Sequence, residues 1–119
     1  MRKRYYSDIM DIYWKSDKLR QELEDKEFLG SKYDQRFADK VVQRIREIGS
    51  APSYAQLPPS TGKHPIKNGK KFLYYAVDLP GLGEKRGKYR LLFYPYGDYD
   101  FAHIETIVAV TILGIDDYH

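Results

Sequence analysis

The chain has 119 residues, of which 42% are hydrophobic and 15% aromatic, enough to bury the core of one domain without cross-links. It has no cysteine, which excludes a disulfide framework and a cysteine-based zinc site and is compatible with a reducing compartment. No apolar run has the length of a signal or membrane segment, so we expect a single soluble domain over residues 1–119, in the cytoplasm and without a membrane partner.

The net charge of +3 hides an uneven distribution of charge along the chain. Residues 62–96 hold eight Lys or Arg against two acids, a balance of +6, whereas residues 97–119 hold five acids and neither Lys nor Arg. A basic surface beside an acidic one suits a polyanion that binds in a defined orientation. The alternative is an ordinary solvated face.

The first predicted helix follows a segment of undecided structure. Residues 9–14 could form a short edge strand or an extra helical turn. Ser16 and Asp17 can then cap a helix that runs to about Phe28 and that Gly30 ends.

A second helix is predicted from a Ser31 cap to Gly49, because apolar residues recur between them at a helical period. These residues are Tyr33, Phe37, Ala38, Val41, Val42, Ile45 and Ile48. The opposite face carries Arg36, Lys40, Arg44 and Arg46, which are either solvated or in contact with RNA or the ribosome.

Strands are predicted in the second half of the chain. A connector rich in Pro, Ser and Gly covers residues 51–69, and the loop over residues 79–87 is too long for a tight hairpin. The expected strands are Phe72–Asp78, Lys88–Tyr96 and Ile104–Ile115. The predicted fold class is α+β, with two N-terminal helices packed on one face of an antiparallel or mixed sheet of four to five strands.

His64 is a candidate general base at the entrance of this sheet. Pro65 restricts it to an extended conformation, and three lysines follow within seven residues. Nearby cations lower the pKa of an imidazole and keep it able to accept a proton. The alternative is an ordinary surface histidine.

Lys88 and Arg90 share one face of a predicted strand, about 7 Å apart, and could straddle a phosphate. Tyr89 and Leu91 take the other face. A solvated charged face is the alternative.

Exposed tyrosines among Tyr74, Tyr75, Tyr89, Tyr94, Tyr96 and Tyr118 could stack on unpaired bases. Candidate RNA-binding residues are Lys63, Lys70, Lys71, Lys85, Arg86, Lys88 and Tyr89.

Asp117, Tyr118 and His119 follow an apolar strand that should anchor them. A nearby carboxylate raises the pKa of an imidazole, which suits His119 as an acid; a disordered tail is the alternative.

His103 is expected to be structural. Three histidines without close spacing give no metal site, so we expect no cofactor. Cleaving RNA without a metal needs a base, an acid and cations around the phosphorane, and His64 and His119 with the nearby Lys and Arg supply these types.

Five short motifs occur in an order that resembles HigB, the killer-toxin branch of the RelE superfamily. They are Leu57-Pro58, His64 to Lys71, Gly87 to Leu91, Gly97 to Asp100, and Asp116 to His119. The resemblance covers roughly residues 31–119. It implies a RelE-like fold and a metal-independent mRNA interferase of a bacterial toxin–antitoxin system. Such an endoribonuclease has mRNA, the ribosome and a HigA-like helix-turn-helix antitoxin as partners.

Matched by motif, the resemblance implies catalytic roles for six residues: His64, Lys67, Arg90, Asp117, Tyr118 and His119. Asp117 or His64 would take the proton and His119 would give one. Lys67 and Arg90 would stabilise the phosphorane, and Tyr118 would stack on a base or position the phosphate.

The chain also departs from the family pattern. Lys88 replaces an asparagine and Tyr89 a tryptophan, and the segments over residues 79–87 and 102–110 are longer than in the compact form. Two alternatives stay open. A toxin with this scaffold could act on another target such as gyrase, or the chain could be a non-catalytic module that binds RNA or an antitoxin.

Overall fold

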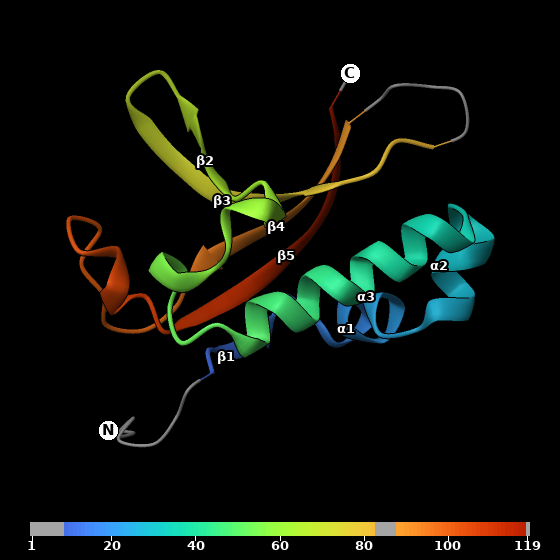
Figure 1. Cartoon of the computed structure of the whole chain (residues 1–119), viewed down its shortest axis with the longest axis horizontal. Coiled ribbons are helices and arrows are strands. Elements are labelled where there is room, and N and C mark those ends of the chain that lie inside the picture. Colours follow the sequence, from blue (N-terminus) through green and yellow to red (C-terminus); the bar gives the residue numbers. More distant parts are fainter. Residues whose placement is uncertain (1–8, 83–87, 119) are drawn as a thin grey trace.

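A five-stranded mixed sheet is the centre of the structure, a computed structural model that describes residues 9–82 and 88–118 (Figure 1). β1 is parallel to β5, the other neighbours are antiparallel, and the order across the sheet is β1-β5-β4-β3-β2. The predicted α+β class is therefore confirmed. The strands are β1 (Asp11–Trp14), β2 (His64–Asn68), β3 (Lys71–Leu79), β4 (Lys88–Pro95) and β5 (Ala109–Tyr118).

Three helices, instead of the two predicted, lie between β1 and β2 in the chain. Of the two possibilities for residues 9–14, the edge strand is the one observed, and it pairs with the first half of β5. The helices are α1 (Asp17–Leu23), α2 (Lys26–Lys32) and α3 (Gln35–Ser50).

The first predicted helix is in fact two helices. Its predicted cap is confirmed, because the Ser16 hydroxyl accepts the N–H of Leu19 at 3.1 Å. The Asp25 carboxylate then caps α2 by accepting two backbone N–H groups at 3.0 and 3.1 Å. Gly30 lies inside α2, so the prediction of one helix that reaches Phe28 and ends at Gly30 is wrong.

The second predicted helix begins later than expected. Asp34, and not Ser31, caps α3, because the Asp34 carboxylate accepts the N–H of Phe37 at 2.7 Å. Ser31 lies within α2, and α3 ends at Ser50, one residue beyond Gly49. The helix begins after Asp34 because its carboxylate bonds an N–H group of the first helical turn, whereas the Ser31 hydroxyl lies three residues earlier.

The predicted connector holds more structure than expected. Two 3-10 turns, η1 (Tyr54–Gln56) and η2 (Pro59–Thr61), follow α3, and β2 begins at His64. The chain is held there by tertiary bonds, since the N–H of Tyr54 donates to the Ile107 carbonyl at 2.9 Å.

The last strand is shorter at its start than predicted. Ile104–Thr106 form a third 3-10 turn, η3, and β5 begins only at Ala109. The Thr106 hydroxyl lies 2.6 Å from the His103 carbonyl, so this segment folds back on itself instead of extending. Isoleucine and threonine content alone therefore misplaced the strand end.

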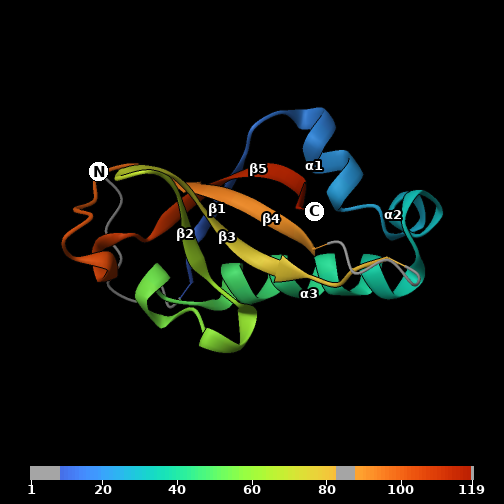
Figure 2. The same ribbon diagram turned by 90° about the horizontal axis from the view of Figure 1, so that it is seen from above.

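The core lies between α3 and one face of the sheet. Phe37, Val41 and Ile48 of α3 and Leu91 and Phe93 of β4 are each 0% exposed. α3 therefore packs on one face of the sheet, whereas α1 lies beside β5 in Figure 2, so the prediction that the N-terminal helices share one face is only partly confirmed. No helix in the described part of the chain is long and apolar enough to cross a membrane.

We expect Asp34→Ala to lower the free energy of unfolding by about 1 kcal/mol, because α3 loses its cap. Ser31→Ala should change it by less than about 0.5 kcal/mol, since Ser31 is an exposed residue within α2. Urea denaturation followed by circular dichroism measures both. Equal losses for the two variants would contradict the observed helix boundary.

Candidate functional site

His64 is the first residue of β2, and its ring is fixed by the turn before it. Nδ1 lies 2.6 Å from the Gly62 carbonyl oxygen. A carbonyl can only accept, so Nδ1 carries the hydrogen and Nε2 is the ring atom left to accept a proton. Gly62 has φ 73°, a conformation that glycine adopts without strain. The turn therefore presents a half-buried imidazole in one defined tautomer.

Asp78 connects this turn to the rest of the sheet. A Cβ at Gly62 would overlap the Asp78 carboxylate, so the carboxylate lies directly against the turn. Asp78 is exposed near the end of β3 and pairs in register with Arg90 of β4. Asp78 therefore lies against the turn before His64 and also pairs in register with Arg90.

Arg90 lies on the face of the sheet away from α3. Its neighbours in the strand take the helix side, since Leu91 is fully buried and the Tyr89 ring is 5.2 Å from that of Phe37. Arg90 also pairs in register with Asp116 of β5. Arg90 therefore has an acidic residue at its register position on each neighbouring strand, an arrangement that favours cross-strand pairs of opposite charge.

We call His64, Asp78, Arg90 and Asp116 the polar row, because they cross the face opposite α3 from β2 to β5. His64 pairs with Ala76, two residues before Asp78, which puts it on that same face. Strand spacing of about 4.8 Å and a rise of about 3.3 Å per residue place His64 and Arg90 roughly 12 Å apart at Cα. The two side chains can therefore approach opposite sides of one phosphodiester.

Sequence reasoning missed Asp78 and Asp116 as neighbours of Arg90. The sequence did contain a signal for Asp78. It precedes the loop over residues 79–87 and Arg90 follows that loop, and opposite charges on either side of a connection are typical of a cross-strand pair. For Asp116 no local signal existed, because its register with β4 depends on a bulge near the middle of β5.

Lys67 does not join the polar row. Side chains alternate along β2, so Lys67 and Pro65 take the face opposite His64. Both line a cavity of ≈ 460 Å³ together with Lys70 and Tyr75. The structure therefore separates two of the residues that the motif resemblance groups together.

The other candidate RNA-binding residues have different surroundings. The Lys63 ammonium donates to the carbonyls of Tyr54 and Ala55 at 2.8 and 3.1 Å, and burial lowers the pKa of Lys63. Lys71 is exposed at the start of β3. The Tyr89 ring packs against the rings of Tyr33 and Phe37 on the α3 side of the sheet, so we do not assign it an RNA contact. Lys85 and Arg86 lie outside the described residues.

At the C-terminal end, the backbone of β5 reaches the start of β4. Register pairs Tyr118 with Lys88 and Asp117 with Tyr89, directly beside the pair of Arg90 and Asp116. The backbone of β5 therefore continues past Asp116 beside the start of β4. His119 lies outside the described residues.

His103 lies in a loop at the other end of the sheet. Its Nδ1 is 3.0 Å from the Asp100 carboxylate, and both side chains are exposed. The N–H of Ala102 and then His103 hold the pKa of Asp100 below its usual value. Within residues 9–82 and 88–118, no group of three His, Asp or Glu could hold a metal ion.

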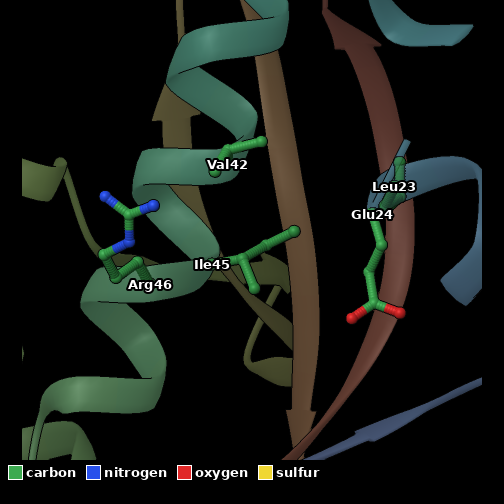
Figure 3. Close-up of a pocket in the computed structure, with 5 residues that line it drawn as sticks. All are labelled: Leu23, Glu24, Val42, Ile45 and Arg46. Atoms are coloured by element: carbon green, nitrogen blue, oxygen red, sulfur yellow. The ribbon is translucent and has the colours of Figure 1, made fainter. Parts of the chain in front are cut away.

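A second groove, of ≈ 270 Å³, lies between α1 and α3. Figure 3 shows Val42 and Ile45 of α3 pointing toward Leu23 and Glu24, with Arg46 on the other side of the helix. The groove has neither an imidazole nor a lysine in its lining. Acid–base chemistry on a polyanion therefore fits the polar row better.

Comparisons with models of protein families, with curated proteins and with solved structures give no match for this chain. The functional argument therefore rests on its residues and their geometry.

Gly62→Ala should lower the free energy of unfolding by more than Gly69→Ala. Both positions have positive φ, so each substitution costs about 1–2 kcal/mol in backbone strain. A Cβ at Gly69 meets nothing within 4 Å, whereas one at Gly62 must displace the Asp78 carboxylate. We expect about 1–3 kcal/mol more from this overlap, measured by thermal denaturation.

The variants Gly62→Ala and Gly69→Ala also test whether the turn at Gly62 positions the His64 ring. The NMR signals of the His64 ring should shift in Gly62→Ala and stay in place in Gly69→Ala, because only Gly62 accepts the bond from Nδ1. Unchanged His64 signals in both variants would refute the positioning role.

Proposed function

We propose that the chain is a HigB-like toxin of the RelE superfamily that cleaves mRNA on the ribosome by metal-free acid–base chemistry. The observation that carries this proposal is that His64 and Arg90 lie on the same face of the sheet, opposite α3. An imidazole and a guanidinium on one face supply a proton acceptor and a phosphate ligand. The order of motifs along the chain supports the choice of family.

In the proposed reaction, His64 Nε2 takes the proton of a ribose 2′-hydroxyl. The 2′-oxygen then attacks the adjacent phosphorus, and the bond to the 5′-oxygen of the next nucleotide breaks. The departing oxygen receives a proton from an acid, for which we propose His119. One proton is taken and one is given, and the products are a 2′,3′-cyclic phosphate and a 5′-hydroxyl. Asp117 pairs in register with Tyr89, which takes the α3 side of the sheet, so we assign the base to His64 alone.

Arg90 is the cation that we place at the phosphorane. Its planar N–H groups can bond two equatorial oxygens at once. Asp78 and Asp116 lie at its register positions on the neighbouring strands, and we propose that their charges orient it. Lys67 takes the opposite face of β2, so we do not assign it this role. With few groups on the face, substrate positioning must come in part from the ribosome.

As partners we propose mRNA, the ribosome and a HigA-like helix-turn-helix antitoxin that keeps the toxin inactive. The protein would act in the cytoplasm, where these partners are, and would need no cofactor. Neither grooves nor helices identify the antitoxin surface, so we assign none.

His64→Ala and Arg90→Ala should each reduce mRNA cleavage by about 10²–10⁴-fold, because each removes a group that acts in the transition state. Primer extension on an mRNA in a cell-free translation reaction measures the cuts, which should need ribosomes. His103→Ala is the matched control, since it removes an exposed imidazole at the far end of the sheet.

Cuts that persist unchanged in His64→Ala would refute this assignment. So would a wild-type protein that arrests growth without cutting mRNA. Toxicity that survives both the His64 and Arg90 substitutions would point to another target such as gyrase.

A further inference from the structure

The cavity that contains Lys67 lies outside the polar row. It is lined by residues of the β2–β3 hairpin, of η1 and of the loop that carries η3. Its volume of ≈ 460 Å³ falls in the range of small-ligand sites. We call it the hairpin cavity.

Aromatic rings form much of the wall of the hairpin cavity. Tyr54 and Tyr75 stack at 3.9 Å between centroids, and Phe72 is 4.8 Å from both Tyr75 and Phe101. Phe101 is 45% exposed, so a large apolar ring stands at the mouth in contact with water. A flat ligand could stack on it and extend the aromatic series.

The two tyrosines also offer hydrogen-bond donors. Burial is the main cause that raises the pKa of both Tyr54 and Tyr75, so their hydroxyls keep their protons at neutral pH. A protonated phenol can donate to the ring nitrogens and carbonyl oxygens of a base.

The charge of the cavity is positive on its hairpin side. Lys67 and Lys70 line it, and among the described residues no acid does. The nearby Asp100 carboxylate is already bonded to the N–H of Ala102 and to His103. An anionic group would therefore lie toward the hairpin, with an aromatic group toward Phe101.

We propose that the hairpin cavity binds one nucleotide of single-stranded RNA, its base stacked on Phe101 and Phe72 and its phosphate at Lys67 and Lys70. Aromatic rings beside lysines are the combination that binds unpaired bases. The choice of RNA as ligand rests on the proposed function. The cavity and its aromatic and basic lining are observed independently of that function.

The position of β2 lets one strand of RNA reach both sites. β2 is an edge strand of the sheet, and His64 and Lys67 lie on its two faces, about 10 Å apart along the strand. A flexible single strand can pass round that edge. The nucleotide in the cavity is therefore not the one cleaved, and its identity would add a sequence preference outside the cut.

Binding can be measured without cleavage, with a labelled 2′-O-methyl oligonucleotide of about eight nucleotides and fluorescence anisotropy. The methyl group removes the nucleophile, so the result does not depend on whether the chain cuts RNA. Phe101→Ala should raise Kd on the order of tenfold through loss of stacking. Lys70→Ala should raise it less and reduce its dependence on salt.

Two substitutions serve as matched controls. Tyr13 of β1 is 44% exposed, but its ring packs on Tyr96 at 4.3 Å and does not line the cavity. Lys18 of α1 is an exposed lysine that does not line it either. Tyr13→Ala and Lys18→Ala should each leave Kd within about twofold if the cavity is the site, since surface substitutions away from a contact have small effects.

A 4-thiouridine in the oligonucleotide provides a second readout, as it should crosslink to Phe101, Phe72 or Tyr75. Equal losses of affinity in the controls and in Phe101→Ala would overturn the proposal, since they would indicate diffuse charge attraction. No binding by the wild type would overturn it as well, and the cleavage assay would still decide the proposed function on its own. An unchanged Kd in Phe101→Ala, with weakened binding of a protein partner instead, would assign the cavity to that partner.

Discussion

Burial of one face of the sheet under α3 is the constraint from which the rest of the site follows. Leu91 and Phe93 of β4 and Val77 of β3 must face Phe37 and its neighbours. Side chains alternate along a strand, so Arg90 has to take the other face. A shift of one residue in β4 would place the Arg90 charge against the core, which would cost several kcal/mol. The polar row is therefore as strongly determined as the core itself.

Several cations serve the fold, although their positions in the sequence also suit RNA. Arg44 of α3 donates to the Asp78 carbonyl at 2.8 Å and pairs with Glu47 at 2.9 Å. Arg36 donates to the Gly81 carbonyl at 2.7 Å. These bonds attach the end of β3 to the helix and so keep Asp78 beside Arg90. Among the described cations, Arg36 and Arg44 thus hold backbone carbonyls, whereas Lys67 and Lys70 of the hairpin are exposed.

Features with local causes could be predicted from the sequence, and features that depend on distant residues could not. The strands β3 and β4 were predicted to within about one residue, because alternation and flanking turns are local signals. The break at Asp25 was missed, since a charged run there resembles a solvated helix face. The pairing of β1 with β5 could not be predicted, because the partner lies about a hundred residues along the chain.

The same distinction applies to the site and explains the place of Lys67. His64 and Arg90 were predicted from residue type and motif, and alternation puts them on one face. The motif resemblance groups Lys67 with His64, and a segment rich in Pro and Gly carries no alternation signal that would separate their side chains. Once His64 begins a strand, Lys67 must point to the opposite face.

A ligand that contacts His64 and Lys67 together has to follow the edge of the sheet round β2. A duplex is too stiff and too wide to make that turn, whereas an unpaired strand can do so with little cost. The geometry therefore selects for single-stranded nucleic acid before any base is read. The mRNA presented by a ribosome, the substrate we propose, meets that requirement.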